Sequence, residues 1–73
     1  MKSDSFEIFL KSLGNNLKEA RKNKDYTQEK MEELCDIVTR YYQKIEAGKS
    51  NITLKTLYRL SEILEVHPSD LLK

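Results

Sequence analysis

The sequence contains few of the residues that metal centres, disulfide frameworks and membrane spans require. Its 73 residues include one cysteine, one histidine, one proline, two glycines and no tryptophan. A lone cysteine cannot form an internal disulfide, which favours a reducing cytoplasm. One histidine and one cysteine cannot supply the four ligands of a structural zinc site. No apolar run approaches the ~20 residues of a membrane-spanning helix. We therefore expect a cytoplasmic chain without metal, cofactor or membrane.

The short length also limits the classes of protein to which the chain can belong. A chain of this size buries only ~60% of its unfolded surface, so we expect one small domain over residues 1–73. A two-lobed cofactor enzyme or a parallel sheet does not fit this length. The sequence shows no glycine-rich phosphate loop, no catalytic triad and no paired carboxylates suited to acid–base catalysis. We expect no enzymatic activity and no small-molecule ligand.

Charge is distributed unevenly along the chain, although the net charge is only +1. Positions 38–59 contain five basic residues and one acidic residue, whereas residues 25–37 contain five acidic residues and one basic residue. Such a local excess of positive charge favours a surface that binds a polyanion. A solvated helix face is the alternative, because most charge runs have no other role.

The spacing of the apolar residues predicts an all-α fold of five helices without strands. The first helix follows capping residues at positions 3–5 and ends near residue 22, with Gly14 as a weak point. The other helices are expected over about 27–36, 39–46, 53–64 and 68–72. The apolar faces are assigned to Phe6, Phe9, Leu10, Leu13, Leu17 and Ala20, then Met31, Leu34 and Cys35, then Tyr42 and Ile45, then Leu54, Leu57, Leu60, Ile63 and Leu64.

Residues that favour helix ends mark these boundaries. The hydroxyls of Thr27 and Thr53 can accept the free backbone N–H groups at the starts of the second and fourth helices. Asp36 tolerates the left-handed conformation of a tight turn, and Gly48 is suited to end the third helix. Pro68 fits the first position of the last helix.

Residues 27–47 have the pattern of two short helices joined by a tight turn, the helix-turn-helix arrangement. Here the sequence resembles the phage repressor and Cro-type family, also called the xenobiotic-response-element (XRE) family. The matching segments are Leu17-Lys18-Glu19-Ala20-Arg21, Thr27-Gln28-Glu29, Ile45-Glu46-Ala47-Gly48-Lys49, Thr53-Leu54-Lys55-Thr56-Leu57 and Val66-His67-Pro68-Ser69-Asp70-Leu71-Leu72. The resemblance covers about residues 10–72 and implies a lambda-repressor-like domain. The small size is similar to that of stand-alone phage repressors and of restriction–modification controller proteins.

Three positions depart from the family pattern. Glu32 replaces a small residue at the contact between the second and third helices, so either the helices lie farther apart or the carboxylate reaches the rim. Asp36 replaces a glycine that the turn usually carries. Val38 replaces the usual Ser or Thr cap, so we expect Thr39 to cap the third helix instead.

The resemblance implies a DNA-binding surface centred on the third helix. The exposed side chains expected to read bases in the major groove are Thr39, Arg40, Tyr41, Gln43 and Lys44. Arginine suits guanine and glutamine suits adenine, which supports this set, although an ordinary wet helix face is the alternative. The residues expected to contact phosphates are Thr27, Gln28, Lys49, Ser50 and Asn51.

The resemblance also implies a partly buried ion pair between Arg21 and Glu46, for which a phosphate contact by Arg21 is the alternative. It further implies a homodimer on a near-palindromic site in double-stranded DNA. The residues expected near the dimer interface are Tyr58, His67, Pro68, Leu71 and Leu72, while Phe6 and Phe9 either extend the core or cover a dimer seam.

Two functions are compatible with these features. The first is a sequence-specific DNA-binding transcriptional regulator. The second is a helix-turn-helix module that mainly binds protein, such as an antitoxin.

Overall fold

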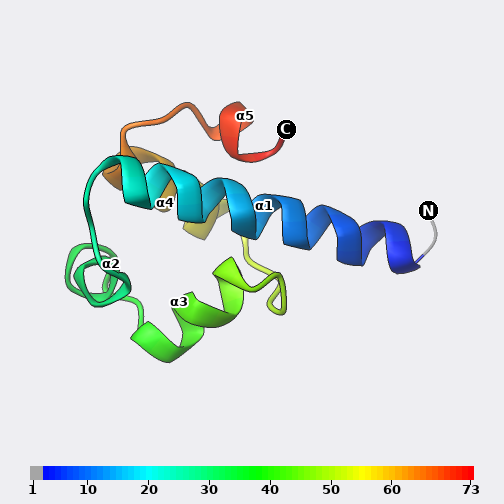
Figure 1. Ribbon diagram of the computed structural model, residues 1–73, viewed down its shortest axis with the longest axis horizontal. Coiled ribbons are helices and arrows are strands. Elements are labelled where there is room, and N and C mark those ends of the chain that lie inside the picture. The colour runs from blue at the N-terminus through cyan, green and yellow to red at the C-terminus, as the bar shows by residue number, and fades with distance from the viewer. Residues whose placement is uncertain (1–2) are drawn as a thin grey trace.

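The predicted five helices are present in the computed structural model, which describes residues 3–73. They are α1 (Ser3–Asn23), α2 (Gln28–Cys35), α3 (Thr39–Glu46), α4 (Leu54–Leu64) and α5 (Pro68–Leu71). The described residues contain no strand, which confirms the all-α fold. In Figure 1 the long α1 crosses the molecule, with α2 and α3 on one side of it and α5 on the other. No helix in residues 3–73 has the length and apolar character needed to cross a membrane.

Four of the residues expected to fix helix ends do so. The hydroxyl of Thr27 accepts a 3.0 Å hydrogen bond from the backbone N–H of Lys30, and the hydroxyl of Thr53 caps α4 in the same way. Asp36 follows α2 with a φ of 56°, in the left-handed region. Pro68 occupies the first turn of α5. These ends are encoded locally, because each depends on residues within one turn of the boundary.

The boundaries of α1 and α5 differ from the prediction, whereas the expected ranges of α2 and α4 differ only by including the capping residues Thr27, Asp36 and Thr53. α1 begins at Ser3, so residues 3–5 are helical instead of preceding the helix. α5 ends at Leu71, one residue earlier than expected. Helix ends have few backbone hydrogen bonds, so the apolar spacing does not determine them to the residue.

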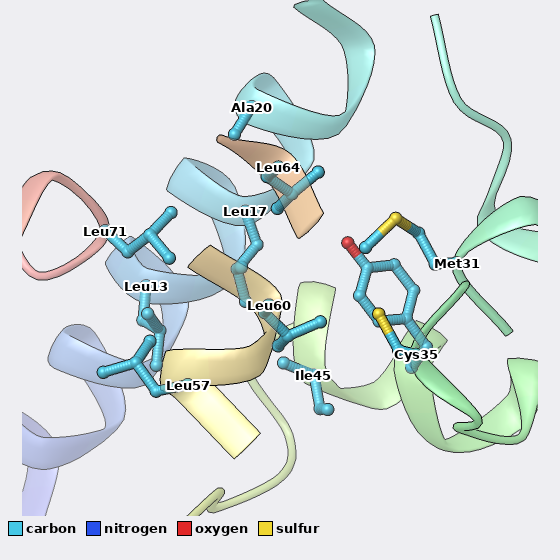
Figure 2. Close-up of a cluster of buried hydrophobic side chains, with 11 residues drawn as sticks. Leu13, Leu17, Ala20, Met31, Cys35, Ile45, Leu57, Leu60, Leu64 and Leu71 are labelled. Carbon is cyan, nitrogen blue, oxygen red and sulfur yellow. The ribbon is translucent and has the colours of Figure 1, made fainter. Parts of the chain in front are cut away.

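The core draws on all five helices and is shown in Figure 2. Its buried residues are Leu13, Leu17 and Ala20 of α1, Met31 and Cys35 of α2, Tyr42 and Ile45 of α3, Leu57, Leu60 and Leu64 of α4, and Leu71 of α5. Cys35 behaves as the expected small core hydrophobe, and its burial raises the pKa of the thiol. Because α3 contributes two of these side chains, its orientation is fixed by the core.

Four residues assigned to apolar faces are instead exposed. Phe6 and Phe9 lie on the first turns of α1 and are 38% and 41% exposed. This end of α1 projects away from the other helices in Figure 1. Leu34 is 39% exposed at the end of α2, and Leu54 is 81% exposed at the first position of α4. The apolar spacing placed them correctly on their helices, but no neighbouring helix covers them.

Gly14 permits a close contact between α1 and the end of α3. A Cβ atom at this position would lie 2.4 Å from the carbonyl oxygen of Glu46 and 2.6 Å from that of Ile45. Any side chain would therefore collide with the backbone of α3. The sequence identified Gly14 only as a weak point of the helix, whereas its structural role is to seat α3 against α1.

Candidate nucleic-acid interface

The helix α3 is anchored by one face and leaves the other in solvent. Tyr42 and Ile45 are buried in the core. The residues expected to read bases lie on the remaining surface of the helix: Arg40, Tyr41, Gln43 and Lys44 are exposed, and Thr39 is half-buried. The hydroxyl of Tyr41 donates a 3.4 Å hydrogen bond to the carbonyl of Asn51, which connects this surface to the loop before α4. The expected residues therefore form one accessible surface that combines two positive charges with neutral hydrogen-bonding groups.

The start of α3 is capped by a residue of α2 and not by Thr39. Val38 occupies the N-cap position, and its side chain makes no capping hydrogen bond. The carboxylate of Glu32 instead accepts a 2.8 Å hydrogen bond from the backbone N–H of Thr39 and a second bond from the Thr39 hydroxyl. These hydrogen bonds lower the pKa of Glu32. The expectation that Thr39 would cap the helix was wrong, because Thr39 is its first residue and donates to Glu32.

Glu32 is exposed, so its carboxylate reaches the rim of the contact between α2 and α3. A carboxylate at the N-terminus of a helix is also favoured by the helix dipole. The two unusual residues, Glu32 and Val38, therefore compensate one another.

The residues expected to contact phosphates are at the two ends of the α2–α3 unit. Thr27 is exposed just before α2, and Gln28 is half-buried at its first position. Lys49 and Asn51 are exposed and Ser50 is half-buried in the loop after α3. These two segments flank the exposed surface of α3.

The loop after α3 turns at Gly48, which has a φ of 72°. A Cβ atom on Gly48 would lie 2.7 Å from the Cα atom of Lys11 in α1. The backbone N–H of Lys49 donates a 2.9 Å hydrogen bond to the carbonyl of Lys44 and closes the end of the helix. Glycine is therefore required here both for its conformation and for the close passage along α1.

The expected ion pair joins the end of α1 to the end of α3. The Nε atom of Arg21 lies 2.7 Å from Oε2 of Glu46, and its Nη2 atom lies 3.1 Å from Oε1. The remaining Nη1 atom donates a 2.8 Å hydrogen bond to the carbonyl of Tyr26. Arg21 is only 9% exposed. Its guanidinium group is thus occupied within the protein, which favours the structural role over a phosphate contact.

This environment stabilises the ionised form of both partners. The hydrogen bond to Glu46 raises the pKa of Arg21. Burial alone raises the pKa of Glu46, but the hydrogen bonds from Arg21 and Gln28 outweigh it, so the pKa of Glu46 lies below its usual value. The pair therefore stays charged at neutral pH and holds α1, α3 and the segment before α2 together.

The hydroxyl of Tyr42 is buried beside this ion pair. It has no hydrogen-bond partner within residues 3–73. Burial and the neighbouring Glu46 carboxylate raise the pKa of Tyr42, so the hydroxyl keeps its proton. The hydroxyl thus lies near enough to Glu46 to affect its carboxylate, yet it makes no hydrogen bond of ordinary geometry within the described residues.

Arg59, one of the five basic residues between positions 38 and 59, has a structural role. Its Nη2 atom donates a 3.0 Å hydrogen bond from α4 to the carbonyl of Cys35 at the end of α2. The contact spans 24 positions, and no local pattern marks it. Arg59 therefore helps to position the helix-turn-helix unit.

The residues expected near a dimer interface have different environments. Leu71 is 1% exposed because α5 turns it into the core between α1 and α4, so its side chain packs within the subunit and not on its surface. His67 caps α5 through Nδ1, which accepts from the N–H of Ser69, and Pro68 is half-buried. Tyr58 and Leu72 are 56% and 41% exposed. Only these last two present large apolar surfaces to solvent.

A shallow apolar groove continues from Leu72 toward the start of α1. Its wall includes Phe6, Phe9 and Leu54, the exposed apolar residues of α1 and α4. Phe6 and Phe9 therefore line a surface groove and do not extend the core.

A short capped helix, a left-handed turn and a second helix held at a fixed angle by core side chains define a helix-turn-helix protein. A family model described as Helix-turn-helix (HTH_3) matches residues 17–71. The chain belongs to this family, and it is of the XRE type that its sequence resembles.

Several known proteins are similar to this chain. The SPbeta prophage-derived uncharacterized HTH-type transcriptional regulator YonR of Bacillus subtilis is 43% identical over 61 residues, which cover 84% of this chain and 56% of YonR. The chain thus spans little more than half the length of YonR. The control protein C.MunI of a Mycoplasma species is 41% identical over 60 residues and 81% of each chain.

Solved structures share the fold. The restriction-modification controller protein C.AhdI from Aeromonas hydrophila matches with a TM-score of 0.80 and 29% identity, over 85% of this chain and 94% of C.AhdI. The hypothetical transcription factor NHTF from Neisseria matches with a TM-score of 0.84 and 26% identity, over 89% of this chain and 75% of NHTF.

Proposed function

We propose that this chain is a sequence-specific transcription regulator that binds double-stranded DNA as a homodimer, with α3 in the major groove. The observation that carries the proposal is the division of α3 into a buried face and an exposed face. Tyr42 and Ile45 fix the helix, and Arg40 and Lys44 project from it into solvent. The similarity to YonR, an HTH-type transcriptional regulator, and to the control protein C.MunI supports the proposed role in transcription regulation.

Some residues of this surface are proposed to read bases, and others to contact phosphates. Arg40 is the second residue of α3, where its fork of donors can reach the N7 and O6 atoms of guanine. Lys49 lies beyond Gly48 and outside the helix, where the sugar-phosphate backbone is within reach. The start of α2, with Thr27 and Gln28, lies at the other end of the unit and offers backbone N–H groups and a helix dipole to a phosphate.

A dimer is needed because one short helix reads few base pairs. Two copies related by a two-fold axis would hold their α3 helices ~34 Å apart, one turn of DNA, on a near-palindromic site. The interface is proposed near Tyr58, His67, Pro68 and Leu72. Sedimentation tests this part: a chain that stays monomeric at high micromolar concentration, both alone and with DNA, contradicts it.

The DNA-binding proposal is tested by separating base readout from phosphate contact. The operator is first obtained by selecting bound duplexes from a random pool. Arg40→Ala should then cost ~1–3 kcal/mol per half-site and weaken the base preference at one position. Lys49→Ala should weaken binding to operator and scrambled duplexes alike, and reduce the salt dependence by about one counterion per half-site.

The possible outcomes distinguish the two tasks. Equal losses on operator and scrambled duplexes for Arg40→Ala would make Arg40 a phosphate contact. If neither substitution alters DNA binding, a protein-binding function such as that of an antitoxin replaces the proposal.

A further inference from the structure

A continuous series of hydrogen bonds connects the buried ion pair to the exposed surface of α3. Arg21 donates to Glu46 at 2.7 and 3.1 Å. The Nε2 atom of Gln28 donates to Oε1 of Glu46 at 3.1 Å. The Nε2 atom of Gln43 donates to Oε1 of Gln28, also at 3.1 Å. The half-buried Gln28 therefore stands between a fixed carboxylate in the core and an exposed glutamine on the proposed reading surface.

The charge of Glu46 sets the direction of every bond in this series. An ionised carboxylate only accepts hydrogen bonds, so the amide nitrogen of Gln28 must face Glu46. The carbonyl oxygen of Gln28 then faces α3, and it too can only accept. Gln43 must therefore turn its amide nitrogen toward Gln28. Reversing the Gln43 amide would bring two carbonyl oxygens together and leave both without a donor.

We propose that Gln28 is a positioning residue that fixes the orientation of the Gln43 amide and so makes α3 select adenine over guanine at one base pair. The inference rests on the proposed DNA-binding function. With one hydrogen of Nε2 held by Gln28, Gln43 keeps its carbonyl oxygen and one N–H for the DNA. An acceptor beside a donor matches the N6 amino group and N7 atom of adenine.

Guanine does not match this arrangement. It presents two acceptors, N7 and O6, in the major groove, so the Gln43 carbonyl would meet the O6 oxygen. A glutamine that rotates freely could turn its amino group outward and donate to guanine. Gln28 removes this option, so it contributes to the choice of base without touching the base itself.

A double-mutant cycle with Gln28→Met and Gln43→Met tests the proposal. Methionine has a similar length but neither donates nor accepts these hydrogen bonds. The relevant base pair is the one whose preference Gln43→Met abolishes, and the quantity measured is the ratio of affinities for adenine and guanine at that position.

We expect a ratio of about tenfold in the wild type, falling to about two- to threefold in Gln28→Met. In the Gln43→Met background, Gln28→Met should leave the ratio unchanged. Glu29→Gln, at the next position of α2, serves as the matched control and should keep the wild-type ratio.

Three results would overturn the proposal. In the first, Gln28→Met weakens binding to all sequences equally and preserves the ratio, which makes Gln28 a phosphate contact only. In the second, the position that depends on Gln43 prefers guanine. In the third, Gln43→Met changes no base preference. If the wild-type chain selects no DNA sequence from the random pool, the result contradicts the proposed function itself. This outcome is therefore distinguishable from a failure of the inference about Gln28.

A measurement on the wild-type chain keeps the test independent of the folding of the variants. Gln28 and Gln43 are the only glutamines in the sequence, so their side-chain amide signals are readily assigned. The 15N relaxation of the Gln43 side chain in the free protein should show restricted motion. Motion as fast as that of an unrestrained surface side chain would contradict the proposed fixation.

Discussion

The carboxylate of Glu32 caps the helix that begins at Thr39, through a 2.8 Å hydrogen bond from the Thr39 backbone N–H. The cap therefore comes from the preceding helix α2 and not from the residue before α3. It joins the two helices of the helix-turn-helix unit at the first residue of α3. The unusual residues at positions 32 and 38 are thus parts of one arrangement, since valine cannot cap and glutamate replaces it.

We predict that a serine at position 38 can take over the role of Glu32. Glu32→Ala should lower the melting temperature, because the backbone N–H and the hydroxyl of Thr39 lose their acceptor. Adding Val38→Ser should recover most of the loss, since a serine N-cap contributes about 1 kcal/mol. Thermal unfolding followed by circular dichroism measures both effects.

Two controls make this cap exchange specific. Val38→Ser alone should stabilise by a similar amount, because an N-cap serine accepts from the N–H two or three residues on, whereas Glu32 serves only the backbone N–H of Thr39. Glu33→Ala removes a neighbouring exposed carboxylate that makes only a 3.6 Å contact to Lys30, and it should have little effect. A Glu32→Ala variant as stable as the wild type would show that Glu32 does not act as a cap, and a double variant no more stable than Glu32→Ala would show that serine cannot replace it.

The contact between Gly14 and the end of α3 predicts that Gly14→Ala destabilises the protein. Alanine usually stabilises a helix relative to glycine, but here its Cβ atom would lie 2.4 Å from the Glu46 carbonyl oxygen. We expect a loss of about 1–3 kcal/mol in the free energy of unfolding, typical of overpacking. Asn15→Ala, one residue along and exposed, should be neutral or stabilising. Denaturant titration compares them, and a stabilising Gly14→Ala would contradict the close contact.

Because the buried Tyr42 hydroxyl has no hydrogen-bond partner within the described residues, we predict that Tyr42→Phe does not lower the stability of the protein. Removing a buried polar atom without a partner should raise the free energy of unfolding by about 1 kcal/mol, while the ring keeps its packing. Chemical denaturation of the two proteins measures the difference. A clear loss of stability in Tyr42→Phe would indicate instead that the hydroxyl donates to Glu46.

The lowered pKa of Glu46 predicts a loss of stability in acid. Its folded-state pKa lies below that of the unfolded chain, about 4.3 for glutamate. The unfolded state therefore takes up a proton first, so the contribution of Glu46 is complete above that pH and is lost as the pH falls through the folded-state pKa. Thermal unfolding between pH 7 and pH 3 should show a plateau above about pH 5 and a decline below it.

The variant Glu46→Gln tests whether this group is responsible. It should be less stable than the wild type at neutral pH, because it leaves the Arg21 charge without its partner. Its stability should then fall less steeply in acid. The same acid slope in both proteins would assign the decline to other carboxylates.

Much of the fold was predictable because helix formation is local. The apolar spacing predicted the five helices. Several of their ends were predicted from residues that act within a few positions of the boundary: Thr27, Asp36, Thr53 and Pro68. The family resemblance added the partners Arg21 and Glu46, which are 25 positions apart and which no local pattern connects.

What the sequence alone determined is which residues share the face of a helix; only the tertiary structure decided which faces are covered. Phe6 and Leu54 follow an apolar pattern and remain exposed, whereas Leu71 is buried, because burial depends on where a second helix lies. The Glu32 cap and the Gln28–Gln43 bond join residues 7 and 15 positions apart. Such contacts form only when the core has fixed the angle between α2 and α3, so the amino-acid types permit them but do not reveal them.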